Sequence, residues 1–428
     1  MNSVKLIPTK LKGKISVPPS KSLAHRAIIA AGLAKGISRI DHIEYSQDIK
    51  ATIKAMKALG TLIEQHEDYL IINGNYTFSK NNMMPGVQID CEESGSTLRF
   101  MVPVSIVKEN KVRFIGQGNL GKRPLNTFYE IFERQNIGYI YRENILDLNI
   151  MGCLKPDIYR LPGNISSQFI TGLLYALPLL SGDSIIELTS PLESKGYIDL
   201  TLSVLKMYGI EIINHEYKQF VVRGRQEYQA CDYWVEADFS QAAFYLVAGA
   251  LGNDVTVMDL NMDSLQGDKA TLDFLKAMNC QIEEHDGGIR VSCDQLQSTV
   301  IDASQCPDVI PVLSLALAVS QGQGEVINAK RLRIKECDRL HATVEELSCL
   351  GANVKEYEDR MSFMPVTGLK GGKVSSHDDH RMAMMLAIAS TVCQKPVIID
   401  NQDCVKKSYP GFWNDFVMLG GKIDGSDI

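Results

Sequence analysis

The sequence predicts an α/β protein in which one supersecondary unit is repeated six times, arranged as two domains of three units. Amphipathic helices repeatedly end in a Gly or Asn that leads straight into a strand-like segment, and both residues suit the left-handed conformation of helix ends. Successive junctions lie 76, 73, 70, 72 and 69 residues apart, at Gly60, Asn136, Gly209, Asn279, Gly351 and Gly420. Periods this long indicate one multiplied unit. Chance and a single solenoid are alternatives, but 428 residues favour two domains.

Each unit is interpreted as strand, helix, strand, helix and two final strands. In the first unit, residues 37–42 are strand-like, Ser46 can cap the following helix, and residues 62–64 and 69–72 resemble a hairpin. The repeat count places the domain boundary near residues 233–238. The later units are expected to open near Gln88, Arg160, Trp234, Val300 and Lys373.

The composition restricts the class of ligand and the compartment. A net charge of −7 and a pI of 5.7 argue against a general nucleic-acid binder, so an anionic ligand needs a local basic cluster. No apolar segment follows Met1, and the richest apolar run, residues 382–393, is too short to span a bilayer. The ten cysteines are scattered without a CxxC motif. Unpaired thiols indicate the cytoplasm.

The stretch PPSKSLAHRAII predicts an anion site at the start of a helix. Ser20 can cap a helix that begins at Lys21, and the first turns also carry His25 and Arg26. Cations here oppose the helix dipole, whose positive end is at the same place. A bound anion, held by Lys21, Ser22, Arg26 and free backbone N–H groups, explains the arrangement. A solvated basic helix start is the alternative.

Three further helix starts carry small polar groups. They are ESGSTLR at 93–99, which contains Gly95, PGNISSQFIT at 162–171, and SKGY at 194–197. Hydroxyl and amide groups at these places could bind oxyanions, or could be ordinary helix caps.

The segment GQGNLGKR at 116–123 matches G-x-G-x-x-G and most of a phosphate-binding loop. Arg123 stands where such a loop needs Ser or Thr, Pro124 follows at once, and the other repeats lack these glycines. The segment is therefore not interpreted as a nucleotide site. Arg123 fits better as a fork for a carboxylate or phosphate.

The second half of the chain contributes four charged segments. Asp308 precedes an apolar helix and could be only its cap. RLRIKECDRL at 331–340 could be a solvated charged helix. In HDDHR at 377–381 the two histidines are three residues apart with no third ligand group nearby in sequence, which argues against a metal site. The fourth charged segment is CVKKSYP at 404–410.

Taken together, these pieces resemble the 5-enolpyruvylshikimate-3-phosphate (EPSP) synthase family, the 3-phosphoshikimate 1-carboxyvinyltransferases. The motifs that carry the resemblance occur in the family's order: PPSKSLAHRA, ESGSTLR, GKRPL, GNISSQF, SKGYID, CPD, RIKECDRL, DDHRMAM and CVKKSYP. The resemblance implies an inverted α/β barrel fold, with three βαβαββ repeats per domain, helices inside and sheets outside. It implies domains at 20–235 and at 1–19 with 236–428, and an active site in the interdomain cleft.

The resemblance also implies the roles of individual residues. Shikimate 3-phosphate is expected to bind Lys21, Ser22, Arg26, Ser166, Ser167, Gln168, Ser194, Tyr197, Asp308 and Lys335. Phosphoenolpyruvate is expected to bind Lys21, Gly95, Arg123, Gln168, Arg339, His380, Arg381 and Lys407. The expected catalytic residues are Lys21, Asp308 and Glu336, with the two carboxylates as the acid–base pair.

The implied reaction transfers the enolpyruvyl group to the 5-hydroxyl of shikimate 3-phosphate through a tetrahedral ketal, a step of aromatic amino acid biosynthesis. The expected partners are these two small molecules, with no cofactor, metal, nucleic acid or membrane, and the chain is expected to be a cytoplasmic monomer. Two positions depart from the family pattern: Glu93, where Asn is frequent, and Arg331, where some members have a substrate-binding Asn.

Two other functions remain as alternatives. The sister enzyme that acts on a UDP-amino sugar expects Lys-Asn in the first motif and a reactive loop cysteine, whereas this chain has Lys21-Ser22 and no cysteine in residues 112–124. A non-catalytic phosphate-binding protein on the same scaffold would not need Asp308 together with Glu336.

Overall fold

The computed structural model describes residues 2–78, 86–108 and 110–424. The chain divides into two compact units, which we call the first unit, Pro19–Val235, and the second unit, Met1–Pro18 with Glu236–Ile428. Each contains its own hydrophobic core. In the part of the chain that is described, no helix is long and apolar enough to cross a membrane.

The described strands form six four-stranded sheets, three in each unit. The first unit has the sheet orders β14-β3-β5-β4, β6-β7-β9-β8 and β10-β11-β13-β12. These strands are β3 (Ile37–Asp41), β4 (Leu62–Gln65), β5 (Tyr69–Asn73), β6 (Val87–Asp90), β7 (Asn110–Ile115), β8 (Gly138–Arg142), β9 (Ile145–Gly152), β10 (Ile158–Leu161), β11 (Ser184–Leu188), β12 (Ile212–His215), β13 (Gln219–Val222) and β14 (Tyr233–Trp234).

The second unit has the sheet orders β16-β17-β15-β2, β18-β19-β21-β20 and β22-β23-β1-β24. These strands are β1 (Val4–Ile7), β2 (Lys12–Ser16), β15 (Asp254–Met258), β16 (Gln281–His285), β17 (Gly288–Ser292), β18 (Val300–Asp302), β19 (Gly324–Ile327), β20 (Asn353–Glu356), β21 (Met361–Met364), β22 (Gly372–Val374), β23 (Val397–Ile399) and β24 (Lys422–Ile423).

The two helices of a repeat differ in burial. The first is rich in small and apolar residues and is almost entirely buried, which accounts for its lack of a polar face. These helices are α1 (Lys21–Leu33), α3 (Gly95–Ser105), α5 (Ser167–Ala176), α7 (Phe239–Ala250), α9 (Ile310–Ala318) and α11 (His380–Ser390). The second helix buries one face only. These are α2 (Gln47–Ala58), α4 (Asn126–Gln135), α6 (Lys195–Met207), α8 (Ala270–Ala277), α10 (Arg339–Cys349) and α12 (Phe412–Met418).

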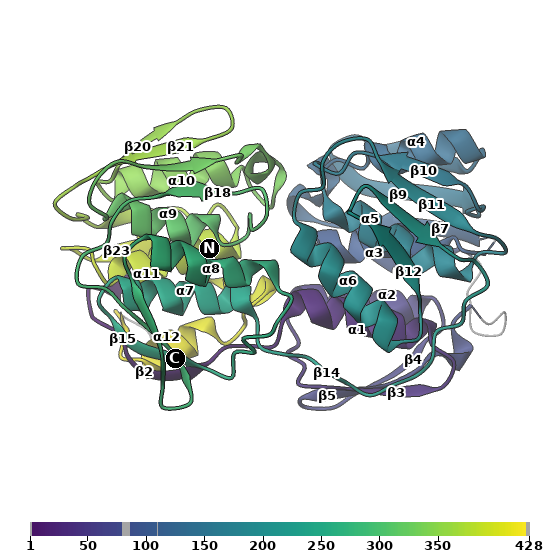
Figure 1. The fold of residues 1–428 in the computed structure, drawn as a ribbon, viewed down its shortest axis with the longest axis horizontal. Helices are drawn as coiled ribbons and strands as arrows, with labels where there is room; N and C mark the ends of the chain where they lie inside the picture. Colours follow the sequence, from purple (N-terminus) through teal and green to yellow (C-terminus); the bar gives the residue numbers. More distant parts are fainter. Residues whose placement is uncertain (1, 79–85, 109, 425–428) are drawn as a thin grey trace. The chain divides into compact units, whose positions relative to one another are not determined.

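Within each unit, helices pack against one another in the interior and the sheets lie around them (Figure 1). α1 contacts α2 and α6, and α3 contacts α5 in the first unit; α9 contacts α7 and α11 in the second. The α/β fold of βαβαββ repeats, with helices inside and sheets outside, is therefore confirmed.

The helix-to-strand junctions adopt the conformation that the sequence predicted. All six residues have positive φ: Gly60 98°, Asn136 56°, Gly209 78°, Asn279 70°, Gly351 98° and Gly420 91°. Each helix thus stops at a residue that tolerates the left-handed region, and the chain turns into the next strand.

One strand assignment from the sequence is wrong. The strand at Trp234, expected to open the fourth repeat, instead pairs in parallel with β3 and completes the first sheet. The fourth repeat opens with β2, which pairs in parallel with β15 over its full length. The preceding strand, β1, lies between β23 and β24 in the sixth sheet. Repeat spacing could not reveal this exchange, because it gives the number of strands and not their partners.

Candidate active site

The start of α1 has the cap that the sequence predicted, and it holds a paired lysine. The Ser20 side chain accepts a hydrogen bond from the Leu23 N–H, and α1 begins at Lys21. Lys21 Nζ lies 2.8 Å from Asp48 Oδ2, in the first turn of α2. Both side chains are largely buried. The carboxylate therefore fixes the ammonium group at the positive end of α1.

Arg26 is buried and held by α6 and its own helix. Its Nε donates to Thr201 Oγ1 at 2.9 Å, and its two terminal nitrogens donate to the carbonyl oxygens of Ser22 and Tyr197 at 2.7 and 2.9 Å. The guanidinium is thus held in one orientation beside Ser22 of the PPSKSLAHRA motif and Tyr197 of the SKGYID motif.

His25 does not contribute a charge to this helix start. The sequence alone suggested that it is a cation of these turns, together with Lys21 and Arg26. Its ring is fully buried, and Nδ1 lies 2.7 Å from Thr52 Oγ1. Burial lowers the pKa of His25 to about 3, so the imidazole is neutral at physiological pH. Lys21 and Arg26 alone supply the positive charge of these turns.

Three sequence motifs meet at Gln168. Arg99 Nη1 donates to Gln168 Oε1 at 2.8 Å, while Gln168 Nε2 donates to Ser96 Oγ at 3.0 Å. Arg99 Nη2 also donates to the Pro124 carbonyl at 3.1 Å. The ESGSTLR, GKRPL and GNISSQF segments are thereby joined, and the amide orientation of Gln168 is set by partners on both sides.

Gly95, the first residue of α3, leaves room for the Arg123 side chain in its present position. A Cβ at Gly95 would lie 2.5 Å from Arg123 Nη1 and 2.9 Å from its Cζ. The guanidinium therefore lies directly over the backbone of a helix N-terminus. The Ser94 side chain caps this helix by accepting from the Thr97 N–H. An anion can contact both the guanidinium and the helix start.

The segment that carries Arg123 does not form a nucleotide-binding loop. β7 is followed by a single 3-10 turn, η2 (Gly118–Lys122), and α4 begins only at Asn126. The Glu93 carboxylate packs on this turn, because a Cβ at Gly118 would lie 2.7 Å from it. Glu93 thus has a structural contact at a position where the family often has Asn.

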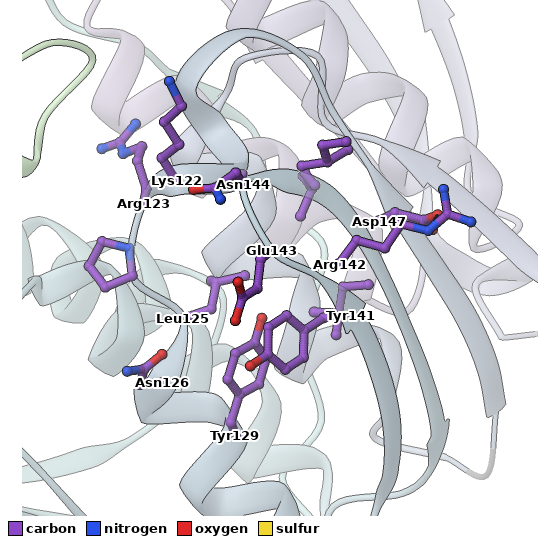
Figure 2. A pocket seen from close by; sticks show the side chains of 15 residues that line it. Lys122, Arg123, Leu125, Asn126, Tyr129, Tyr141, Arg142, Glu143, Asn144 and Asp147 are labelled. Atoms are coloured by element: carbon purple, nitrogen blue, oxygen red, sulfur yellow. Dashed lines mark ion pairs between the residues drawn. The ribbon is translucent and has the colours of Figure 1, made fainter.

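A pocket of about 240 Å³ opens beside the same segment. Figure 2 shows Lys122 and Arg123 at its edge, with their nitrogen atoms directed away from Glu143 and the Tyr129 ring. The pocket is also lined by the carboxylates of Glu143 and Asp147, and we do not assign it to the anion site.

The hydroxyl groups expected around the phosphate have different local roles. Ser166 caps α5, since its Oγ accepts from the Gln168 N–H at 3.3 Å. Ser167 is the first, buried residue of that helix. Ser194 is buried in the left-handed region, with φ 57°, just before α6. Tyr197 lies in the first turn of α6 and offers its carbonyl to Arg26.

In the second unit, Asp308 is surrounded by cations and is not a helix cap. The capping position of α9 is occupied by Val309. Asp308 Oδ1 lies 3.0 Å from Lys335 Nζ and 2.9 Å from Arg339 Nη1, and Oδ2 lies 3.5 Å from Arg381 Nη2. The alternative that Asp308 serves only as a cap is therefore excluded.

Arg339 links three carboxylates. Besides Asp308, its Nη2 lies 2.7 Å from Glu336 Oε2, and its Nε lies 2.7 Å from Asp379 Oδ2. Arg339 is only 1% exposed. The segment 331–340 is accordingly not a solvated helix: it forms a 3-10 turn, η5 (Lys330–Ile334), and then enters α10 with Arg331 and Arg339 buried.

Burial and the neighbouring charges together shift two pKa values in this cluster. Burial would raise the pKa of Asp308, but the positive charges of Lys335, Arg381 and Arg339 outweigh it and hold the pKa well below its usual value. Burial lowers the pKa of Lys335 to about 8, and the charges of Arg339 and Arg331 act in the same direction. Asp308 is therefore ionised, and Lys335 loses its charge only slightly above neutral pH.

Asp379 fixes the start of α11, where two further residues of the expected site lie. Its carboxylate accepts from the Arg381 N–H at 2.9 Å and also binds Arg339. His380, 1% exposed, has Nδ1 3.6 Å from Asp379 Oδ1. Lys407 ends the 3-10 turn η6 (Gln402–Lys407) and is buried.

The predicted residues fall into two sets according to the unit that contains them. In the first unit these are Lys21, Ser22, Arg26, Gly95, Arg123, Ser166, Ser167, Gln168, Ser194 and Tyr197; in the second they are Asp308, Lys335, Glu336, Arg339, His380, Arg381 and Lys407. We call these the first and second residue sets. The first combines cations with neutral donors, and the second combines cations with two carboxylates suited to proton transfer.

A sequence model of the family described as EPSP synthase (3-phosphoshikimate 1-carboxyvinyltransferase) matches residues 6–416. The chain belongs to the EPSP synthase family. A 3-phosphoshikimate 1-carboxyvinyltransferase of Clostridioides difficile (strain 630) is 56% identical, with 99% of each chain covered. One from Clostridium perfringens (strain ATCC 13124) is 54% identical, covering 99% of this chain and 100% of the relative.

Solved structures agree with the fold of the EPSP synthase family. An EPSP synthase from Acinetobacter baumannii superposes with a TM-score of 0.79 at 22% identity, covering 99% of this chain and 100% of that one. The enolpyruvyl transferase NikO from Streptomyces tendae gives a TM-score of 0.80 at 15% identity, covering 98% of each chain.

Several residues that organise the site of this EPSP synthase family member were missed by sequence reasoning. Asp48 pairs with Lys21, Arg99 orients Gln168, Thr201 binds Arg26, and Asp379 binds Arg339. Arg99 and Asp379 stand inside the motifs that carry the resemblance, so their position was a usable signal. Asp48 lies in a helix that no motif marks, whereas Thr201 lies in α6, two residues after the SKGYID motif.

Proposed function

We propose that this chain catalyses the reaction of its family, the transfer of the enolpyruvyl group of phosphoenolpyruvate to the 5-hydroxyl of shikimate 3-phosphate, with release of phosphate. The observation that carries the residue assignment is the cluster in which Asp308 and Glu336 both contact Arg339, beside Lys335 and Arg381. Two carboxylates embedded in fixed cations suit a reaction that moves protons between anionic substrates.

Shikimate 3-phosphate is assigned mainly to the first residue set. Its phosphate would be bound by hydroxyl groups of Ser166, Ser167 and Ser194, while its ring would contact Gln168 and Tyr197. Support comes from the rigid orientation of Gln168 by Arg99 and Ser96, which presents a defined amide face. Lys21, Ser22 and Arg26 complete the expected contacts, and Asp308 and Lys335 contribute from the second unit.

Phosphoenolpyruvate is assigned to Arg123, Arg339, Arg381 and Lys407, with Lys21, Gly95, Gln168 and His380. Arginine forks suit the planar carboxylate and the phosphate of this substrate. The contact of the Arg123 guanidinium with Gly95 supports the assignment, since a side chain at position 95 would displace the guanidinium from the start of α3. Because the two residue sets belong to different units, we propose that both units bind one substrate pair.

The chemistry follows in two steps. In the addition step, the 5-hydroxyl oxygen attacks C2 of phosphoenolpyruvate and the hydroxyl proton goes to one carboxylate. C3 receives a proton and becomes a methyl group. In elimination, the methyl group returns a proton, the bond from C2 to the phosphate oxygen breaks, and phosphate leaves. The arginines and Lys21 stabilise the departing phosphate. Asp308 and Glu336 are proposed to hold these protons.

The substrates themselves are expected to activate Asp308. Without ligand, its low pKa makes it a weak base. Two phosphate groups placed among the same cations would offset their positive potential, and the pKa of Asp308 would rise. The carboxylate would therefore become a better base when both substrates are bound.

The deciding experiment compares substrates. Purified chain is supplied with phosphoenolpyruvate and either shikimate 3-phosphate or UDP-N-acetylglucosamine, and phosphate release is followed. We expect turnover with shikimate 3-phosphate alone. Turnover only with the UDP-sugar would identify the sister activity, and binding of shikimate 3-phosphate without phosphate release would identify a binding protein.

The cytoplasm is the proposed location. All ten cysteines are free, which suits a reducing compartment.

A further inference from the structure

We propose that α10 and the loop before α11 form a binding site for one divalent transition-metal ion of the Zn²⁺ class. Its ligands would be His341, Glu345 and Glu346 of α10 and His377 of the loop. This site lies outside both residue sets and goes beyond the transfer reaction, in which the ion would take no part.

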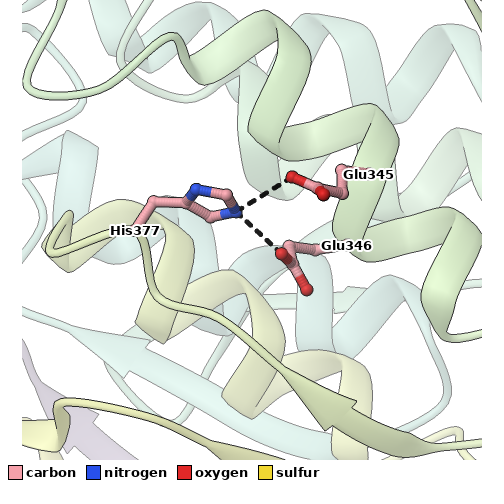
Figure 3. Close-up of side chains that lie close together, drawn as sticks. All are labelled: Glu345, Glu346 and His377. Atoms are coloured by element: carbon pink, nitrogen blue, oxygen red, sulfur yellow. Dashed lines mark hydrogen bonds and ion pairs between the residues drawn. The ribbon is translucent and has the colours of Figure 1, made fainter.

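Three ligand atoms converge at the centre of this site. His377 Nε2 lies 2.7 Å from Glu346 Oε1 and 3.6 Å from Glu345 Oε2 (Figure 3). One ligand atom from each of the three residues lies within 4.8 Å of the others. Nitrogen and oxygen ligands about 2.0–2.2 Å from Zn²⁺ are separated by roughly 3.3 Å in a tetrahedron. Small side-chain movements would therefore admit the ion.

His341 provides a second, independent indication. It precedes Glu345 by one helical turn, and its Nε2 also lies 3.6 Å from Glu345 Oε2. Its other ring nitrogen, Nδ1, lies 2.8 Å from Glu356 Oε2. When neutral His341 donates its Nδ1 proton to Glu356, its Nε2 lone pair faces the Glu345 carboxylate. A carboxylate behind an imidazole is the usual arrangement around a metal-bound histidine.

The buried carboxylate of Glu346 is also held by a backbone N–H group. Glu346 Oε2 accepts from the Ser375 N–H at 3.0 Å, which leaves Oε1 directed at His377. Glu346 is buried, His377 is partly exposed, and Glu345 and His341 are exposed. An ion can therefore enter from solvent while one ligand is held firmly.

An imidazolium–carboxylate pair without a metal is the competing interpretation. Hydrogen bonding to Glu346 raises the pKa of His377, and hydrogen bonding to Glu356 raises that of His341. Protons and metal ions compete for the same ring nitrogens. The two interpretations differ in one measurable property: an imidazolium–carboxylate pair binds no ion, whereas the proposed site binds one ion per chain.

The sequence argument against a metal in HDDHR concerned His377 with His380, and the proposed site does not use that pair. His377 finds its partners on α10, 31 residues away in the case of Glu346. A linear motif could not show this.

The ion would join two segments of the second unit. His377 and Asp378 both have positive φ, at 51° and 54°, a conformation that side chains adopt at a cost. The next residue, Asp379, caps α11 and binds Arg339. A bound ion would thus stabilise the folded second unit, in proportion to its concentration relative to its dissociation constant.

The test uses the metal-free full-length chain, titrated with Co²⁺ and followed by visible absorption, with Zn²⁺ stoichiometry measured by equilibrium dialysis. We expect one ion per chain, with Co²⁺ bands of nitrogen and oxygen ligation and without sulfur charge transfer. His377→Ala should weaken binding at least about tenfold, and Glu356→Gln roughly 10–100-fold.

The matched controls are His285→Ala, which removes a histidine paired with Asp286 outside the site, and Cys349→Ser, which removes the exposed thiol of α10. Both should bind Co²⁺ as the parent chain does. If His377→Ala does not fold, His341→Ala, at an exposed position, replaces it. Absence of stoichiometric binding, binding that survives both histidine variants, or loss of binding in Cys349→Ser would overturn the proposal.

Discussion

At the scale of single residues, the second residue set is organised by a buried arginine. Arg339 contacts Asp308, Glu336 and Asp379 at 2.7–2.9 Å. Removing one partner of a buried ion pair leaves an uncompensated charge and costs about 3–5 kcal/mol. Substitution of Arg339 would therefore affect folding and binding together, so the informative substitutions are those of its partners.

We expect Asp308→Asn to lower kcat by roughly 10²–10⁴-fold, the usual effect of removing a proton-transfer group. The amide keeps the shape of the side chain but loses its charge, so the surrounding cations become more available to anions. Substrate affinity, measured by titration, should fall far less than kcat. Asp302→Asn, at an exposed position, is the control. Near-normal turnover in Asp308→Asn would remove this carboxylate from the mechanism.

The charge of Lys335 predicts an alkaline limit to activity. Its pKa is lowered to about 8, so the ammonium form predominates below that pH and is lost above it. Since the substrates are anionic, kcat/KM should fall as the pH rises through about 8. In Lys335→Arg the group stays charged, and the decline should move to higher pH. An identical pH profile in both proteins would assign the decline to another group.

Arg123→Lys should weaken phosphoenolpyruvate binding more than shikimate 3-phosphate binding. A guanidinium forms two parallel bonds to a planar anion, and an ammonium cannot reproduce them. Separate titrations with each substrate measure the difference. Equal losses for both substrates would contradict the assignment of Arg123 to phosphoenolpyruvate.

At the scale of helices and strands, the junction residues provide a test of the repeat. Gly420 has φ 91°, and a Cβ there would contact nothing within 4 Å. Gly420→Ala therefore probes backbone strain alone, and we expect a loss of about 1–2 kcal/mol in the free energy of unfolding. Gly420→Asn should lose less, because Asn tolerates the left-handed region.

Urea unfolding followed by tryptophan fluorescence measures this effect. The chain has two tryptophans, Trp234 in the first unit and Trp413 in α12, so a Trp234→Phe background restricts the signal to the second unit. Gly411→Ala, at the start of the same helix and with φ −80°, is the control. An equal loss in both variants would mean that the left-handed conformation is not the cause.

The features that sequence predicted correctly are local ones. The caps at Ser20 and Ser46 and the left-handed junctions depend on residues within one helical turn, where spacing determines the contact. The neutral state of His25 depends on burial by other helices, and the pairing of Arg339 with Asp379 spans 40 residues. Such long-range contacts are absent from local patterns, although the motif resemblance brought most of their residues to attention.

At the scale of the whole molecule, the N-terminal residues complete two sheets of the second unit. β1 is an inner strand of the sixth sheet and β2 an edge strand of the fourth, with Leu6 and Ile15 buried in the core. The chain then enters the first unit at Pro19 and returns at Glu236. Two connections therefore link the units.

The last prediction concerns the response of the two units to substrate. We proposed that side chains of both units bind one substrate pair. A ligand that binds more tightly when both units contact it shifts the population toward arrangements with both contacts. We expect the radius of gyration from small-angle scattering to decrease when shikimate 3-phosphate is added. High salt should reduce the effect only as far as it reduces binding. Shikimate, which lacks the phosphate, is the control and should cause a smaller change at the same concentration. An unchanged radius at saturating shikimate 3-phosphate would mean that the units do not approach each other on binding. Water would then have to be excluded from the ketal intermediate by some means other than closure.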